Sequence, residues 1–363
     1  MAKLFFYITL FSTLCFAQEI PVPAIDFSPE KYICYNSIEP LVIDGRLDEL
    51  SWSKAEWTNY FVDIEGAAKP SPRFATRAKM LWDSIYFYVA AELEEPDIWA
   101  TLKNRDDIIF YDNDFEVFID PDGNTHGYCE FEMNAFNTVW DLFLIQPYRD
   151  IENASIHGWD MKGLKSGAAV YGTINKPGDK DSCWTVEIAF PWEVFKEITS
   201  TNVPPKNNDQ WRVNFSRVEW QTEVQNGNYK KTINPATGKH YPEDNWVWSP
   251  QGVVNMHYPE MWGYVQFSTG IVGSGNAVFN ENIEEKVKWF LRQIYYAEKK
   301  YFNENKTYTN DFGVLGVQSP AIKGFAGSPV IECTTNMFEA YLQSEDGAII
   351  ISIDDNGLVK RSK

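Results

Sequence analysis

The feature that most constrains the fold is an alternation of apolar and polar residues in short segments, beginning at residue 77. Every second residue is apolar in residues 184–190, and residues 211–215 repeat the pattern. A repeat of two residues places successive side chains on opposite faces of a strand. Strands of this kind have one apolar face to bury, so we expect an all-β domain of two antiparallel sheets packed as a sandwich.

Polar connections rich in glycine and proline separate the expected strands. The clearest hairpin turns at Asp83 and Ser84. Residues 221–245 are expected to be a long loop that forms one lip of a binding cleft, because loops of this length are usually functional or mobile. The predicted strands are residues 78–82, 85–91, 115–119, 128–134, 138–144, 184–190, 211–220 and 263–267.

The length of 363 residues indicates more than one domain, since a single domain usually has roughly 100–200 residues. We expect the main domain at residues 32–267 and a flexible linker of small residues at 268–281. A small α+β domain is expected at 282–363. In that domain Asn282 is placed to cap an amphipathic helix, and Asn356-Gly357 predicts a tight turn in an antiparallel sheet. The strand-like runs are residues 330–335, 337–342 and 348–353.

The first 17 residues predict an export signal. Lys3 precedes an apolar run at residues 4–14, and Ala17 offers a small residue for cleavage. The run is shorter than the roughly 20 residues that cross a membrane as a helix, so no membrane insertion is expected. Cys15 would suit a lipoprotein, but Leu14 is large for the position before a modified cysteine. The mature chain is therefore expected to be secreted or periplasmic.

The charge and the cysteines limit the classes of function. A net charge of −19 argues against binding to nucleic acid, which requires clustered basic residues, and against anionic lipid surfaces. Aromatic residues make up 16% of the chain, and exposed aromatic rings suit stacking on flat ligands. Four cysteines admit three disulfide pairings in an oxidising compartment, and buried free thiols are the alternative. These cysteines are Cys34, Cys129, Cys183 and Cys333.

Several segments between residues 40 and 267 together resemble family 9 carbohydrate-binding modules. In the family's order they are IDGRLDELSW at 43–52, residues 79–92 with WDSIYFYV at 82–89, NDFEVFIDP at 113–121, YCEFEMN at 128–134, WTVEIAFPW at 184–192 and VNFSR at 213–217. The resemblance implies a jelly-roll-like sandwich that holds one or two sugar units between aromatic side chains. It implies non-catalytic binding of oligo- or polysaccharide, in capture or catabolism beside secreted glycan-degrading enzymes. The tail domain, by the order of its elements, loosely resembles the globular part of bacterial pseudopilins, and no function is drawn from this.

The resemblance also implies positions for the residues that contact sugar. One aromatic clamp falls at Phe110 or Tyr111, where this chain has no Trp. Carboxylates and amides bond sugar hydroxyls, and aromatic rings cover the C–H faces of the sugar. The other implied contacts are Glu116, Glu130, Glu132, Asn245 and a second clamp at Trp248, with Trp246 beside it. Relatives that bind glucans tend to have amide or basic residues at positions 130 and 132, so the preferred sugar stays open.

Structural calcium is a further implication of the resemblance. Asp residues supply the hard oxygen ligands that calcium takes, although their spacing here does not match an EF-hand loop. The alternative is that these residues stabilise turns through bonds to their own backbone. The candidate ligands are Asp112, Asp114, Asp120 and Asp122.

Two other classes of function were weighed against carbohydrate binding. A carboxylate pair such as Glu116 with Glu132 could hydrolyse glycosides. Related sandwiches bind haem, with Met133 and His257 as conceivable axial ligands, although no Cys-x-x-Cys-His motif is present. The sequence contains no nucleophile elbow, phosphate loop or zinc motif.

Overall fold

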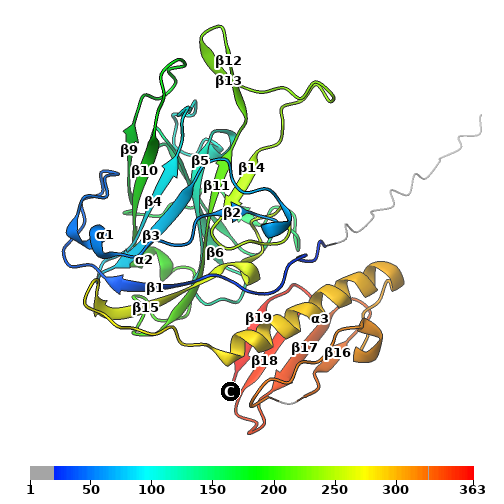
Figure 1. Cartoon of the computed structure of the whole chain (residues 1–363). Coiled ribbons are helices and arrows are strands. Elements are labelled where there is room, and N and C mark those ends of the chain that lie inside the picture. The colour runs from blue at the N-terminus through cyan, green and yellow to red at the C-terminus, as the bar shows by residue number, and fades with distance from the viewer. Residues whose placement is uncertain (1–19, 326) are drawn as a thin grey trace, which may run out of the picture.

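The computed structural model describes residues 20–363 except residue 326. The predicted export signal at residues 1–17, with Cys15, lies outside the described residues. Figure 1 shows a large sandwich of strands and, below it, a small unit in which helix α3 lies on a second sheet. Among the helices of the described part, none has the length and apolar character needed to cross a membrane.

One half of the sandwich is built around β5 and β6, which pair antiparallel along their whole lengths. β11 continues this half: its residues 212–216 pair with β5, and its residues 216–219 pair with β14. The strands of this half are β2 (Val62–Asp63), β5 (Asp114–Asp120), β6 (Tyr128–Asn134), β7 (Val139–Leu144), β8 (Ser155–Ile156), β11 (Gln210–Glu219) and β14 (Asp244–Val247).

The other half joins the first where residues 210–213 of β11 pair with β15. Its pairs are antiparallel except that β1 runs parallel to both β15 and β3. This parallel strand is an exception to the predicted antiparallel pattern, and it comes from a segment that was not predicted as a strand. The strands of this half are β1 (Lys31–Asn36), β3 (Thr76–Trp82), β4 (Tyr86–Glu94), β9 (Lys165–Tyr171), β10 (Cys183–Pro191) and β15 (Gly263–Ile271).

Alternate side chains of the two halves meet in one apolar core, which confirms the predicted sandwich. Trp184 and Trp211 contribute from opposite halves, and both are almost completely buried. Burial of each large apolar side chain contributes about 1.5–3 kcal/mol, so the alternation observed in the sequence is also the main source of stability. The described cysteines are free thiols, with Cys34 and Cys129 buried in this core.

The segment predicted as a long loop contains a hairpin. β12 (Thr222–Gln225) and β13 (Asn228–Lys231) pair antiparallel around Asn226 and Gly227, which have φ values of 53° and 77°. Asn-Gly favours this turn because both positions require positive φ. The predicted long loop at residues 221–245 therefore includes a short hairpin that was not predicted, and the Asn-Gly turn was the signal for it.

Helix α3 (Ile283–Asn305) begins where predicted, and the side chain of Asn282 accepts a hydrogen bond from the N–H of Glu284 at 3.0 Å. Its apolar face covers a four-stranded antiparallel sheet. The strands are β16 (Val330–Cys333), β17 (Phe338–Gln343), β18 (Ile350–Asp354) and β19 (Val359–Ser362). The short helices are α1 (Leu50–Lys54), α2 (Trp192–Phe195), η1 (Gly66–Ala68), η2 (Ile109–Tyr111), η3 (Pro259–Met261) and η4 (Phe312–Leu315).

The segment expected to be a flexible linker lies against the sandwich. β15 continues to Ile271, and the Gln266 side chain then bonds the backbone of Val278 at 2.9 Å and of Asn280 at 2.7 Å. The N–H of Ala277 donates to the hydroxyl of Tyr35 at 3.1 Å. These bonds hold the connection in a defined path to α3.

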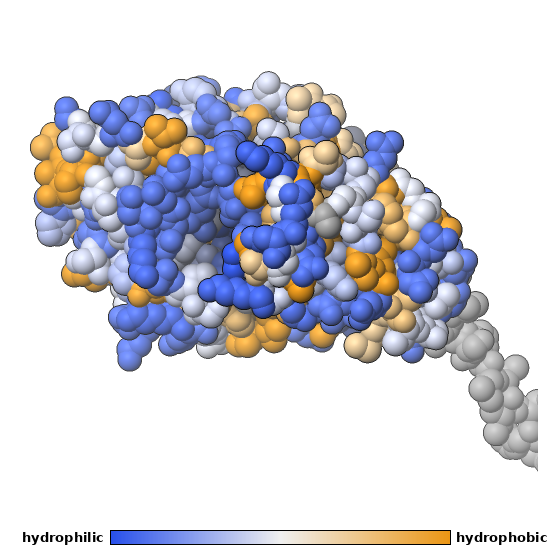
Figure 2. Space-filling model, turned by 90° about the horizontal axis from the view of Figure 1, so that it is seen from below, coloured by the Kyte–Doolittle hydropathy of each residue, from blue (hydrophilic) through white to orange (hydrophobic). Residues whose placement is uncertain are grey.

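Buried polar contacts fasten α3 to the sandwich. Arg212 of β11 and Glu285 of α3 form an ion pair at 2.8 Å. Glu260, also buried, accepts a hydrogen bond from Tyr296 of α3 and lies 2.9 Å from Arg149. Seen from the side on which α3 lies, the surface is mostly hydrophilic with separate apolar patches (Figure 2). The two units are therefore joined by charge and hydrogen bonds as well as by apolar packing.

Candidate functional site

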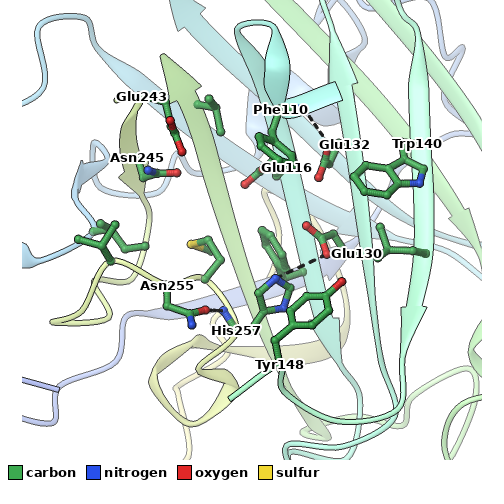
Figure 3. Close-up of a pocket in the computed structure, with 16 residues that line it drawn as sticks. Phe110, Glu116, Glu130, Glu132, Trp140, Tyr148, Glu243, Asn245, Asn255 and His257 are labelled. Carbon is green, nitrogen blue, oxygen red and sulfur yellow. Dashed lines mark hydrogen bonds and ion pairs between the residues drawn. The ribbon is translucent and has the colours of Figure 1, made fainter. Parts of the chain in front are cut away.

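A cavity of about 310 Å³ lies on the face of β5, β6 and β7 that is turned away from the core (Figure 3). Strand geometry decides which side chains reach it. Phe115 and Val117 enter the core, so Glu116 and Phe118 point to the opposite face. Pockets for small molecules occupy roughly 300–1,000 Å³, so this one has room for a small ligand.

Three glutamates form the polar wall of the cavity. Glu116 lies across from Glu132 in the pairing of β5 with β6, and Glu130 lies across from Phe118. The carboxylate of Glu132 accepts the N–H of Phe110 at 3.0 Å. The cavity thus brings together Glu116, Glu130 and Glu132, three of the residues that were predicted to contact sugar.

Burial changes the protonation of these glutamates. They are 5%, 6% and 1% exposed in the order Glu116, Glu130 and Glu132. Loss of water raises the pKa of Glu116 to about 7. Burial and then the charge of Glu116 raise the pKa of Glu130 and of Glu132 well above the ordinary value. At neutral pH the carboxyl group of Glu116 is therefore close to half protonated, and a protonated carboxyl group donates as well as accepts hydrogen bonds.

The opposite wall comes from β14 and from the loop before η3. Asn245 and Glu243 face the cavity from one side, and Asn255 and His257 face it from the other. His257 is 4.0 Å from Glu130, and burial lowers the pKa of the imidazole to about 3. The imidazole is therefore neutral near pH 7 and does not compensate the carboxylates.

Aromatic rings complete the lining. Of the two residues considered for the first clamp, Phe110 lines the cavity, whereas Tyr111 lies beside Phe110 and is 52% exposed. Trp140 and Tyr148 also line the cavity and were not predicted. Trp140 lies across from Glu132 in the pairing of β6 with β7, a register that was not predicted from the sequence.

Trp246 and Trp248 do not line the cavity, contrary to expectation. Both indoles are 2% exposed and pack in the core between the sheets. Asn245 and Val247 point to the face opposite to Trp246, as the alternation along β14 requires. An amide at position 245 and an indole at position 248 have opposite parity, so strand geometry separates the two predicted contacts.

The four aspartates proposed as calcium ligands do not gather at one point. Asp112 and Asp114 stand at the start of β5, and Asp120 and Asp122 stand at its end, about 20 Å away at the rise of a strand. Asp120 accepts the N–H groups of Gly123 and Thr125, both at 2.9 Å, which is a turn-stabilising role.

Asp112 is fully engaged with the protein. Its oxygen atoms accept the N–H and the hydroxyl of Thr101, the N–H of Leu102 and the amide of Asn134, all at 2.7–3.0 Å. Asp114 is different, because an oxygen of its side chain lies within 4.8 Å of oxygen atoms of Glu116 and Glu132. Of the four candidate aspartates, Asp114 is the one that belongs to a group of three acidic side chains close enough to share an ion, among the residues that the structure describes.

The structure also places the residues of the two alternative functions. Glu116 and Glu132, the pair considered for glycoside hydrolysis, are cross-strand neighbours. Met133 packs in the core, whereas His257 lines the cavity on the outer face of the same sheet. These two residues are on opposite faces and do not converge on one haem.

Comparisons with known proteins give one family and a few distant relatives. The profile of the family described as "Carbohydrate family 9 binding domain-like" matches residues 43–266. "Exoglucanase XynX" of Acetivibrio thermocellus is 26% identical over 164 residues, which are 44% of this chain and 12% of that protein. This chain therefore spans about one eighth of the length of that relative.

Two solved structures are similar at low identity. A protein of Bacteroides uniformis that is proposed to bind carbohydrate has a TM-score of 0.49 and 13% identity, covering 66% of this chain and 100% of its own. A family 9 carbohydrate-binding module of Caldicellulosiruptor kristjanssonii, solved with cellotriose, has a TM-score of 0.40 and 18% identity, covering 69% and 100%.

Proposed function

Since this chain belongs to the carbohydrate family 9 binding domain-like family, we propose that the cavity on the outer face of β5–β7 binds a carbohydrate without cleaving it. The observation that carries the proposal is the composition of the cavity. Carboxyl groups and an amide converge there beside aromatic rings, which is the combination that recognises sugars.

Each wall has a distinct part in the proposed complex. Glu116, Glu130 and Glu132 bond the sugar hydroxyls from the strands, and the amide of Asn245 bonds them from the opposite side. The rings of Phe110 and Trp140 cover the C–H faces of the sugar.

Calorimetric titration of residues 18–363 with glucose, cellotriose and xylotriose tests the proposal. We expect saturable binding of one of these sugars, and a loss of affinity of at least tenfold in Asn245→Ala. Asn336→Ala, in an exposed turn of the C-terminal sheet, is the matched control and should bind like the parent protein. Binding that Asn245→Ala leaves unchanged would move the sugar away from this cavity.

The absence of cleavage is a separate part of the proposal. Long incubation with the sugar that binds should release no new reducing ends, and Glu116→Gln should behave in the same way. Release of reducing ends that Glu116→Gln abolishes would instead support the glycosidase reading of the Glu116–Glu132 pair.

We also propose that the chain is exported and acts beside secreted enzymes that degrade glycans. The support is the signal-like composition of residues 1–17 and the similarity of part of the chain to a protein named as an exoglucanase. Expression of the full sequence with fractionation of the cells tests the export, since a processed N-terminus at Gln18 is expected outside the cytoplasm.

A further inference from the structure

We propose that Asp114, Glu116 and Glu132 bind a divalent cation of the calcium type in the wall of the cavity, and that the bound cation contacts the sugar. These three residues are called the carboxylate cluster below. The contact with sugar rests on the function proposed above, whereas the cation site itself does not.

Strand pairing fixes the geometry of the carboxylate cluster. Asp114 and Glu116 stand two residues apart on β5, and Glu132 lies across from Glu116 on β6. Oxygen atoms of all three side chains lie within 4.8 Å of one another. Because the residues are on neighbouring strands rather than on loops, the distance between their oxygen atoms is set before any ligand arrives.

One oxygen of the cluster lacks a partner. Asp114 is completely buried, and its Oδ1 accepts the N–H of Val218 at 3.2 Å. Its Oδ2 has no hydrogen-bond partner among the described residues. Buried polar atoms in native proteins are nearly always bonded, so this oxygen indicates a ligand that the protein itself does not supply.

The charge of the cluster is also uncompensated. Among the ion pairs formed by the described residues, the one at this cavity joins His257 to Glu130. The imidazole of His257 is neutral near pH 7. All three side chains are at most 5% exposed, and their oxygen atoms lie within 4.8 Å of one another. A buried cluster of carboxylates is neutralised either by protons or by a cation. A divalent cation interacts with all three carboxylates at once.

The donor atoms favour calcium. Calcium takes about six to eight oxygen ligands in flexible geometry, whereas zinc prefers nitrogen and sulfur, which the cluster lacks. Three carboxylates leave coordination positions free toward the cavity. Neighbouring sugar hydroxyls are neutral oxygen donors that can fill those positions.

Direct cation binding is the first test. The protein is treated with EDTA, dialysed, and titrated with calcium by calorimetry and with terbium by luminescence sensitised by nearby aromatic residues. We expect one site per chain, and a loss of affinity of at least tenfold in Asp114→Asn, which keeps an acceptor for Val218. Glu132→Gln is the second variant, used if Asp114→Asn fails to fold by circular dichroism.

The chain offers a matched control in a second acidic trio. Asp106, Asp141 and Asp160 also approach one another within 4.8 Å, but Arg105 bonds Asp160 at 2.8 Å and also pairs with Asp141. The guanidinium of Arg105 contacts all three carboxylates of that trio, so Asp160→Asn should leave cation binding unchanged. Cation binding that Asp160→Asn removes and Asp114→Asn retains would overturn the proposal.

Sugar titrations with calcium and with EDTA then test the second part. A fall in sugar affinity of at least tenfold in EDTA supports the contact between cation and sugar. Equal sugar binding in both conditions, without calcium binding, overturns the inference and leaves the proposed function standing. Calcium binding that depends on Asp114, with no sugar bound in any condition, leaves the cation site and overturns the proposed function.

Discussion

Glu116 shows how one residue position can control the chemistry of the whole cavity. It lies between Asp114 on its own strand, Glu132 across the sheet and Ser216 across the other side. Its pKa of about 7 means that a small change of pH, or a bound cation, changes the charge of the wall. At the scale of the residue, stability and ligand binding therefore depend on the same carboxyl group.

The free energy of unfolding should fall as the pH rises from about 4.5 to about 7. Burial raises the pKa of Glu116 in the folded protein above its ordinary value of 4.5, so the folded state holds the proton longer than the unfolded state. The effect of Glu116 alone is about 3 kcal/mol. Urea unfolding in EDTA at several pH values checks it, and Glu116→Gln should give a flatter profile.

Other groups titrate in the same pH range. Burial raises the pKa of Glu187 to about 7, which acts in the same direction as Glu116, whereas burial lowers the pKa of His257 to about 3, which acts in the opposite direction. Glu260 and Glu285 are buried, but nearby basic groups lower the pKa of each to about 2. Their stabilisation is complete above pH 4.5 and is lost only as the pH falls toward 2. Equal slopes for the parent protein and Glu116→Gln between pH 4.5 and pH 7 would contradict the pKa assigned to Glu116.

Trp248→Ala should lower stability rather than affinity. The indole is buried in the core, so its removal leaves a cavity and should reduce the free energy of unfolding by about 3–5 kcal/mol. The fraction that stays folded should bind sugar with the affinity of the parent protein. Denaturant unfolding and calorimetric titration of the same preparation separate the two effects, and a tenfold loss of affinity would contradict the placement.

The site could be predicted in part from single residues. Four of the predicted residues line the cavity, because each is at a strand position whose side chain points away from the core and the alternation of these strands is visible in the sequence. These residues are Glu116, Glu130, Glu132 and Asn245. Trp248 was assigned to the cavity from the resemblance to the family, whereas its parity places it in the core. Trp140 and Tyr148 were missed because strand pairing and loop path, rather than local pattern, bring them to the cavity.

At the scale of the element, two contacts attach the hairpin β12–β13 to the sandwich. The ammonium of Lys231 lies 3.2 Å from the centre of the Trp220 ring. Burial lowers the pKa of Lys231 to about 8. The hydroxyl of Tyr229 donates to Asp97 at 2.9 Å. The chain then leads from the hairpin to Glu243 and Asn245, so these contacts help to fix the position of one wall.

Lys231→Ala should loosen the hairpin and weaken sugar binding by a few-fold. A cation over an aromatic ring contributes about 0.5–2 kcal/mol, and its loss leaves the turn at residues 226–227 less anchored. Hydrogen exchange should become faster over residues 222–231. Lys230→Ala, on the exposed side of the same strand, is the control. Equal exchange in both variants would show that Lys231 does not anchor the hairpin.

At the scale of the whole molecule, the two units share one polar interface. Burial alone would raise the pKa of Glu260, but Arg149 and Arg292 lower it to about 2, so its charge is stabilised from both units. Arg292 of α3 also donates to the hydroxyl of Thr125 at 2.9 Å. The helix cap in the sequence indicated the division into two units. The ion pairs and hydrogen bonds between the units could not be predicted, because they join residues that are distant in the sequence.

Glu260→Ala should destabilise both units together. Removal of one partner of a buried ion pair costs about 3–5 kcal/mol, because the remaining guanidinium groups lose their counter-charge. Differential scanning calorimetry should show one transition in the parent protein and one transition at lower temperature in the variant. Glu304→Ala, exposed on α3, is the control. Two separate transitions in the parent protein would contradict the shared interface.

The attachment of α3 has a consequence for how the protein presents its ligand site. A unit joined by a loose tether would let the sandwich turn freely, but the ion pair of Arg212 with Glu285 and the contacts of Glu260 leave little freedom of rotation. The C-terminal unit, which is α3 with its sheet, therefore has a fixed orientation relative to the sandwich. Any surface or partner that binds this unit also sets the direction in which the cavity opens.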